Sequence, residues 1–141
     1  MGSFSDVPAL IAGGTINPFR FVTASTAADN TGIQAAAVDT VVVGVSDGST
    51  KGPLSSAHAE SGDPINLQGG DIVLVQCGTA NLPTRGELVQ ANTADGTARV
   101  AVTTVGPARR FQGYVALENG VSGGIIRIQK VGSFVYYPTT L

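Results

Sequence analysis

Residues 111–131, FQGYVALENGVSGGIIRIQKV, decide the fold class of this 141-residue chain. Two apolar segments, 111–117 and 125–128, flank a loop that is rich in glycine. Within the segments apolar and polar residues alternate, and a period of two is typical of a β-strand. The glycines between them supply the positive φ that a tight reversal requires. The stretch therefore predicts a β-hairpin, with Val115 and Leu117 sharing one face of its first strand.

The same rhythm of short apolar runs separated by turns extends over most of the chain. Asp95-Gly96 between two such runs is a strong hairpin signal. No helical pattern is available to cover a parallel sheet. We therefore expect an all-β fold, a small β-barrel or β-sandwich of short antiparallel strands. The expected strands are residues 18–23, 33–38, 41–45, 65–67, 72–76, 88–91, 97–102, 111–117 and 125–129.

Residues 54–62 are the only helix candidate, because Ser55 or Ser56 could cap a helix that Gly62 ends. The same segment contains the single histidine, His58. A serine, a histidine and an acid at neighbouring positions point apart, whereas a catalytic triad draws its members from separate elements. We therefore interpret His58 as a solvated loop residue.

The chain divides into an N-terminal arm (1–16), a β domain (17–131) and a C-terminal tail (132–141). The arm contains an apolar run, residues 7–11, that must be buried on its own domain or on a neighbouring molecule, and we favour the neighbour. Four large side chains follow one another at 134–137 in the tail, and in an extended chain they cannot all face one core. The tail therefore lies between two layers of its own fold or packs on another subunit.

The composition limits the classes of partner. Charged residues make up 13% of the chain, about half the usual fraction, and 43% of residues are hydrophobic. A neutral surface of this kind either is covered by a partner or is the Ser/Thr/Gln-rich exterior of a compact β domain. The net charge of −2 and the scattered basic residues argue against nucleic acid as a partner. No apolar run is long enough for a membrane span, and no signal peptide is expected.

The chain offers little for catalysis or metal binding. Cys77 and His58 are the only residues of their types, and a zinc site needs about four such ligands. No phosphate-cradling motif or calcium-loop spacing is present. Gly70-Asp71 and Gly86-Glu87 read as two strand starts rather than as a pair of catalytic acids. We expect no enzymatic activity, no cofactor and no metal.

Arginines and apolar ends mark a candidate interface. Arg20 and Arg127 each stand between apolar neighbours in an expected strand, so we expect both to point away from the core and to be available for ion pairs. The candidate interface residues, for a partner protein or a second subunit, are Val7, Pro8, Leu10, Ile11, Arg20, Arg109, Arg110, Arg127, Phe134, Val135, Tyr136 and Tyr137.

Over residues 14–131 the chain resembles the small capsid decoration (cement) proteins of tailed bacteriophages and prophages. The resemblance implies a β-barrel or β-sandwich domain on the capsid exterior of the virion, made in the host cytoplasm. It implies the major capsid protein as partner, with self-association as a homotrimer or a dimer. The tail after Val131 departs from the family pattern. The motifs that carry the resemblance are a Gly-rich arm followed by Val43-Gly44-Val45-Ser46, Gly69-Gly70-Asp71-Ile72-Val73-Leu74, Gly86-Glu87-Leu88-Val89, Asp95-Gly96-Thr97-Ala98 and Gly113-Tyr114-Val115-Ala116-Leu117-Glu118-Asn119-Gly120.

The expected function is therefore structural. Such a protein binds the outer surface of an expanded icosahedral capsid and clamps neighbouring major capsid subunits, gaining affinity by multivalency. The alternative is a receptor- or glycan-binding β module displayed on a virion or cell surface, for which Tyr114, Tyr136 and Tyr137 would supply exposed aromatic rings.

Overall fold

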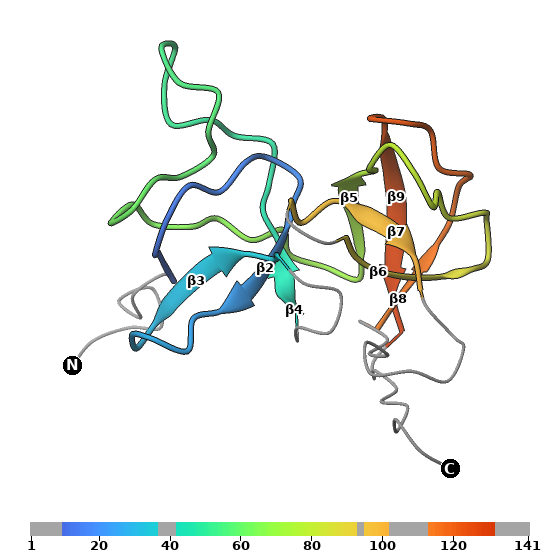
Figure 1. The fold of residues 1–141 in the computed structure, drawn as a ribbon, viewed down its shortest axis with the longest axis horizontal. Helices are drawn as coiled ribbons and strands as arrows, with labels where there is room; N and C mark the ends of the chain where they lie inside the picture. The colour runs from blue at the N-terminus through green and yellow to red at the C-terminus, as the bar shows by residue number, and fades with distance from the viewer. Residues whose placement is uncertain (1–9, 37–41, 93–94, 102–112, 132–141) are drawn as a thin grey trace.

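The computed structural model describes residues 10–36, 42–92, 95–101 and 113–131. All regular structure within these ranges is β, and they contain no helix (Figure 1). The nine strands are β1 (Ile11–Ala12), β2 (Phe21–Ala24), β3 (Thr31–Gln34), β4 (Val42–Val45), β5 (Ile72–Gln76), β6 (Leu88–Ala91), β7 (Ala98–Val100), β8 (Tyr114–Ala116) and β9 (Ile125–Lys130).

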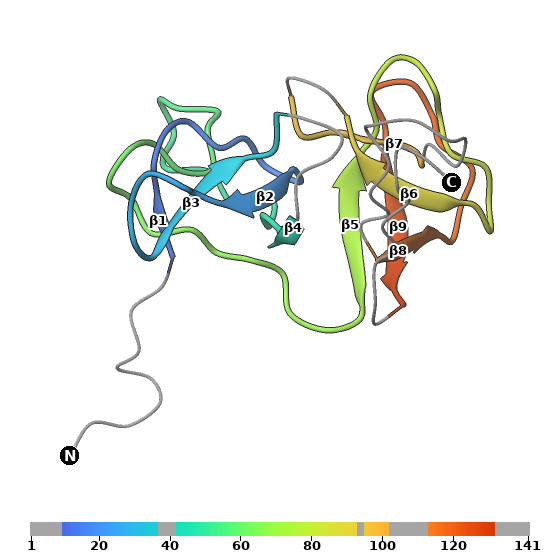
Figure 2. The same ribbon diagram turned by 60° about the horizontal axis from the view of Figure 1, so that its bottom comes forward.

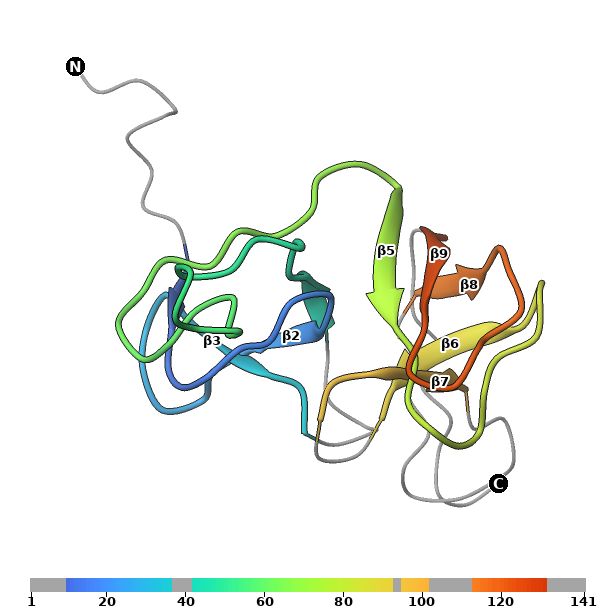
Figure 3. The ribbon, with the colours of Figure 1, turned by 90° about the horizontal axis from the view of Figure 1, so that it is seen from above.

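The strands form two sheets that lie side by side in every view (Figures 1, 2 and 3). The first has the strand order β1-β3-β2-β4 and the second β5-β9-β8-β6-β7. Neighbouring strands are antiparallel except for the parallel pair β1 and β3. The predicted all-β, mainly antiparallel fold is thus confirmed. Neither sheet closes into a barrel over the described residues, so the barrel alternative is excluded.

The predicted hairpin is formed by β8 and β9, which pair antiparallel from Tyr114↔Lys130 to Ala116↔Ile128. In β9 the predicted alternation is observed, because Ile126 and Ile128 are buried whereas the residues between and after them are exposed. In β8 the core face carries Tyr114 and Ala116, and Val115 on the opposite face is half-buried. The aromatic ring, rather than the β-branched side chain, faces the core of the hairpin.

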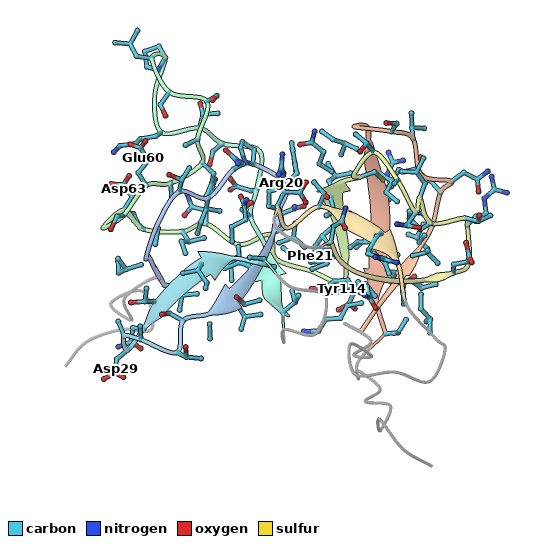
Figure 4. All side chains as sticks on the ribbon, viewed as in Figure 1. Arg20, Phe21, Asp29, Glu60, Asp63 and Tyr114 are labelled. Atoms are coloured by element: carbon cyan, nitrogen blue, oxygen red, sulfur yellow. The ribbon has the colours of Figure 1, made fainter. Side chains whose placement is uncertain are left out.

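One hydrophobic core joins the two sheets. The rings of Phe21 in β2 and Tyr114 in β8 are 5.6 Å apart at their centroids and tilted by 53°, a favourable aromatic geometry. Figure 4 shows both rings at the junction of the sheets. Because this cluster takes members from both sheets, the two sheets bury each other. The other buried members are Ala35, Val45, Val73, Val75, Cys77, Val89, Ala91, Ala98, Ala116, Ile126 and Ile128.

A second, smaller core packs against the first sheet and includes residues that we predicted to belong to the N-terminal arm. Ile16 is fully buried, and Ala12 in β1 is nearly so. They pack with Val22, Ala59 and Ile65. The folded body therefore begins by residue 10, inside the range 1–16 expected to be an arm.

Residues 54–62 do not form the expected helix. A turn closes from Ser55 N–H to the carbonyl of Gly52 (3.1 Å), and Ala59 forms an isolated bridge with Ile16. The serine side chain competes with the helical pattern, because Ser55 Oγ accepts the N–H of Ala57 (3.2 Å). The serine that was expected to cap a helix instead fixes a turn.

β5 is an edge strand of its sheet, and its free edge is covered by the side chain of Gln68. Gln68 Oε1 accepts the N–H of Leu74 (2.9 Å), and Gln68 Nε2 donates to the carbonyl of Leu74 (2.7 Å). The amide group thus imitates one residue of a neighbouring strand. Two residues further along the same edge, Gln76 N–H donates to the carbonyl of Phe19 (2.9 Å). The expected strand 65–67 is reduced to an isolated bridge between Leu67 and Ser46.

Candidate interaction surface

His58 braces the long loop between β4 and β5. Its side chain is only 1% exposed. The ring Nδ1 lies 2.9 Å from the carbonyl oxygen of Ser49, and Nε2 accepts the N–H of Asn66 (3.0 Å). Because Nε2 is an acceptor, the hydrogen is assigned to Nδ1, where it is donated to Ser49. The prediction of a solvated histidine is therefore wrong, because both ring nitrogens bind backbone groups inside the loop.

Asp47 and Ser49 stand beside His58 without forming a catalytic triad. Asp47 Oδ1 accepts the N–H of Ser49 (2.9 Å) and lies 3.3 Å from His58 Nδ1. Partial burial raises the pKa of Asp47, but hydrogen bonds from the hydroxyl and amide of Ser49 and the nearby His58 outweigh it, so the pKa lies below its ordinary value. His58 Nε2 already binds a backbone N–H, so it has no free lone pair to activate a serine. The cluster is a structural brace.

A fully exposed leucine lies at the tip of the braced loop. Leu54 is 100% exposed at the third position of the Gly52–Ser55 turn. Below the turn, Lys51 N–H donates to the carbonyl of Ala57 (2.8 Å). Leu54 is thus a single exposed apolar side chain on an ordered turn and does not by itself mark an interface.

Ion pairs close the base of this turn. Lys51 Nζ lies 2.9 Å from Asp63 Oδ2 and 3.1 Å from Glu60 Oε2, and Figure 4 labels both acids. The hydrogen bond from Lys51 lowers the pKa of Asp63, and the two carboxylates raise the pKa of Lys51. The geometry of the loop is thus fixed by side chains as well as by its backbone.

Arg20 points inward, contrary to the prediction. Its Nη1 donates to the carbonyl of Asp95 (2.8 Å) and its Nη2 to Gln76 Oε1 (3.2 Å). β2 begins at Phe21, so Arg20 precedes the strand and does not follow its alternation. Phe19 before it has a positive φ of 58°, which turns the backbone at this point. Arg20 therefore ties the first sheet to the second at their junction (Figure 4).

Arg127 lies on the outer face of β9, as predicted, beside an apolar surface. The exposed fractions of Ile72, Leu74 and Ile125 on this face are 55%, 37% and 48%. Leu74 is directly opposite Arg127 in the β5–β9 ladder, so the four side chains share one side of the sheet. Arg127 Nη1 is 3.5 Å from Glu118 Oε2. We call Ile72, Leu74, Ile125 and Arg127 the outer face.

Sequence reasoning missed the apolar part of the outer face, although a signal was present. Residues 72–75 are Ile-Val-Leu-Val, with apolar side chains at both parities. A strand of this composition is typical of a sheet that is covered on both sides. In the described structure Val73 and Val75 are buried, whereas Ile72 and Leu74 still face solvent.

The remaining predicted interface residues divide into two groups. Leu10 packs against the smaller core, and Ile11 is half-buried in β1, so the body itself uses both. The others lie outside the described residues: Val7, Pro8, Arg109, Arg110, Phe134, Val135, Tyr136 and Tyr137.

Tyr114 is buried, so it cannot serve as an exposed ring for a glycan, as the alternative function required. Burial also raises the pKa of its hydroxyl. Tyr136 and Tyr137, the other two rings named for that function, are among the residues that the structure does not describe.

In the described part of the chain, no three His, Cys, Asp or Glu side chains gather where a metal ion could be held. Over the same residues no helix is long and apolar enough to span a membrane. The chain matches no model of a known protein family, and no curated protein matches its sequence.

Proposed function

We propose that this chain is a structural virion protein that binds the outer surface of an expanded icosahedral phage capsid and stabilises it by clamping neighbouring major capsid subunits. The proposal begins from the resemblance of residues 14–131 to capsid decoration proteins. The observation that supports it in the structure is the way in which β1, the first described strand, is attached to the body.

β1 is held on both sides although it has only two residues. On one side it pairs parallel with β3, and on the other it meets the segment around residues 62–65. Five backbone hydrogen bonds hold it and its neighbours: Ile11 N–H to Asn30 O (2.9 Å), Gly13 N–H to Gly32 O (2.9 Å), Ala12 N–H to Asp63 O (2.8 Å), Gly62 N–H to Ala12 O (2.8 Å) and Ile65 N–H to Leu10 O (2.8 Å).

This attachment suits a segment that carries load. Residues 1–9 precede Leu10 and β1 in the sequence, so on this proposal a pull along the axis of β1 would load all five hydrogen bonds in shear. Each such bond contributes about 0.5–1.5 kcal/mol net, and side-by-side bonds loaded in shear must break in concert. On this proposal Val7 and Pro8 contact a capsid subunit, and β1 passes the load to the body.

Rigidity of the body supports the same role. A clamp opposes displacement of its partners only if force on one contact is not absorbed by internal motion. The shared core, and the Arg20 hydrogen bonds to Gln76 and Asp95, connect the two sheets that such force would otherwise separate. A second contact elsewhere on the body would then gain from multivalency.

The test uses expanded heads of the phage or prophage that encodes the chain, prepared without it. The purified full-length chain is added, and copies per head are counted by cryo-electron microscopy and gel densitometry. We expect saturable binding at icosahedral positions. A variant lacking residues 1–9 should lose occupancy while its thermal unfolding stays unchanged. A variant lacking only residues 1–5, which keeps Val7 and Pro8, is the matched control.

Two results would contradict the proposal. One is the absence of saturable binding of the full chain to expanded heads. The other is equal occupancy of the full chain and the 1–9 deletion, which would remove the role assigned to the segment before β1.

A further inference from the structure

We propose that Asn119 is a site of spontaneous deamidation, and that its conversion to isoaspartate releases the loop that covers Cys77. Asn119 is exposed in the loop between β8 and β9, and it is the one asparagine of the chain that glycine follows. Glycine has no side chain to keep its nitrogen away from the neighbouring amide, so an Asn-Gly pair is a reactive setting for this thermolabile residue. The inference does not rest on the capsid proposal, because it concerns the loops of the second sheet alone.

The reaction needs only water as a co-reactant. The backbone nitrogen of Gly120 attacks the side-chain carbon Cγ of Asn119, the Cγ–Nδ2 bond breaks, and Nδ2 takes the Gly120 proton and leaves as ammonia. The product is a succinimide ring, and water then cleaves one of the bonds that join this ring to the Gly120 nitrogen. Cleavage at Cγ leaves aspartate. Cleavage at the backbone carbonyl carbon leaves isoaspartate, in which the main chain runs through Cγ and is one carbon atom longer.

A neighbouring loop holds both reacting groups in the native fold. Gly120 N–H donates to the carbonyl of Pro83 (2.7 Å), and Asn119 Oδ1 accepts the N–H of Arg85 (2.9 Å). The two loops lie side by side at one edge of the molecule (Figures 1 and 3). Ring closure turns the Gly120 nitrogen onto Cγ and removes its hydrogen, so both bonds oppose it. The fold therefore slows the reaction, which proceeds when this pair of loops opens locally.

Packing requires the glycine that makes Asn119 reactive. A Cβ atom at position 120 would lie 2.8 Å from Pro83 Cδ, 3.1 Å from the Pro83 carbonyl oxygen and 3.2 Å from Leu82 Cβ. These separations are shorter than ordinary van der Waals contact, so any other residue would push the two loops apart. The close contact between the loops thus retains a chemically labile pair of residues.

Isoaspartate cannot keep both hydrogen bonds. In isoaspartate Oδ1 and the Gly120 N–H belong to one peptide group, and in a trans peptide group the carbonyl and the N–H point in opposite directions. Their present partners, the Pro83 carbonyl and the Arg85 N–H, lie two residues apart on a single segment. That segment is too short to reach opposite sides of the group. Aspartate keeps the ordinary main chain and both bonds, so only the isoaspartate product releases the loop.

The released loop covers Cys77. Cys77 N–H donates to the carbonyl of Gly124 (2.7 Å), and the backbone of Val121 hydrogen-bonds the thiol. Under this cover Cys77 is 1% exposed. Isoaspartate removes the attachment of Gly120, the residue next to Val121, so the reactivity of the thiol reports on the modification.

The first experiment incubates the full-length chain in mildly alkaline buffer, both native and in urea, and follows its tryptic peptides by mass spectrometry. Asn119 lies in peptide 111–127; the internal control is Asn81 in peptide 52–85, which is also exposed but precedes leucine. Asn119 should give isoaspartate and aspartate in both states, more slowly in the native state by roughly 10- to 100-fold, the effect of two hydrogen bonds. Equal rates in the two states, or conversion of Asn81 as fast as that of Asn119, would overturn the proposal.

The second experiment isolates the deamidated chain by ion exchange, determines its isoaspartate content, and measures the reaction of Cys77 with a disulfide reagent at neutral pH. A fraction equal to the isoaspartate content should react faster than the unmodified chain by on the order of 10-fold or more, because two bonds that held the loop are lost. Asn119→Asp is the matched control. It has the same added charge on an ordinary main chain, so its thiol should react at the wild-type rate.

Each other outcome contradicts the proposal. A thiol that reacts equally slowly in the deamidated chain would overturn the link between Asn119 and Cys77, and an Asn119→Asp variant as reactive as isoaspartate would assign the effect to charge. Circular dichroism of the deamidated chain should equal that of the unmodified chain, and a lost β signal would contradict a release confined to the loop. None of these measurements uses capsids, so their failure is distinguishable from failure of the capsid proposal.

Discussion

Replacing Phe21 with leucine tests whether the two sheets unfold as one unit. Phe21 belongs to β2 in the first sheet, is fully buried, and packs on Tyr114 of the second. Full truncation of a buried phenylalanine to alanine costs about 3–5 kcal/mol, a large share of the 5–15 kcal/mol that is typical of a domain. Leucine is the milder change, since it keeps an apolar side chain in the site and removes the aromatic pairing.

The magnitude follows from two losses. The aromatic pair contributes about 0.5–1.5 kcal/mol beyond its buried area. The volume that leucine does not fill, roughly 20–25 Å³, adds about 0.5 kcal/mol at roughly 24 cal/mol per Å³ of cavity. We therefore expect Phe21→Leu to lower the free energy of unfolding by about 1–2 kcal/mol. The exposed Val43 of β4 is the matched control, because Val43→Ala should stay within about 0.5 kcal/mol of wild type.

The assay is urea unfolding followed by circular dichroism, combined with native-state hydrogen exchange. If the sheets share one cooperative core, protected amides of β2 and of β9, both interior strands, lose the same increment of free energy. Reduced protection in the first sheet alone, with the second unaffected, would refute the single-core reasoning.

Three further perturbations test the loop and the buried thiol. His58→Ala removes a buried side chain and leaves the Ser49 carbonyl and the Asn66 N–H without their ring partner, so urea unfolding should show a loss of about 1–3 kcal/mol, whereas Leu54→Ala on the same loop should leave stability unchanged. Lys51→Met should raise the pKa of Asp63 toward its ordinary value, measured by NMR titration of the carboxyl. Since the folded pKa of Asp63 is lowered, this pair stabilises the fold above the ordinary carboxyl pKa and ceases to do so as pH falls through the folded value, so wild type and Lys51→Met should converge in stability in acid. Cys77 is buried, and burial raises the pKa of its thiol, so it should resist a disulfide reagent at neutral pH and react fully in urea; rapid reaction of the native protein would contradict its burial.

The parts of the fold that the sequence predicts well are those set by local alternation and turn chemistry. β5 and β6 have the bounds expected, and each follows a Gly-acid turn. Gly70 and Gly86 in those turns both adopt positive φ, 86° and 89°. β9 also follows its alternation.

The parts that local pattern does not predict depend on distant partners. β1 is only two residues long and exists because β3 and the segment around Pro64 lie on either side of it. The environment of His58 likewise depends on Ser49 and Asn66, nine residues before it and eight after it. Hydrogen bonds of this kind leave no periodicity in the sequence, so an apolar arm and a solvated histidine are what the pattern alone indicates.

The two strand arginines of the candidate interface also show what local pattern can and cannot predict. The exposure of Arg127 follows from strand alternation and is predicted. Arg20 was expected to behave alike, but β2 begins at Phe21 rather than at residue 18, so Arg20 lies before the strand and its side chain joins the sheets. The full exposure of Leu54 could not be predicted once the segment was read as a helix.

The position of Gln68 has a consequence for the behaviour of β5 while the chain is being synthesised. β5 pairs with β9, whose residues lie some fifty positions later, so during synthesis β5 emerges well before its partner strand. Gln68 lies only six residues from Leu74 and can bind one edge of β5 as soon as that strand leaves the ribosome. One of the two edges of this nascent apolar strand is thereby blocked from pairing with other chains, while the other edge stays available for β9. Gln68→Ala should accordingly increase light scattering during cell-free synthesis more than it lowers the stability of the finished fold.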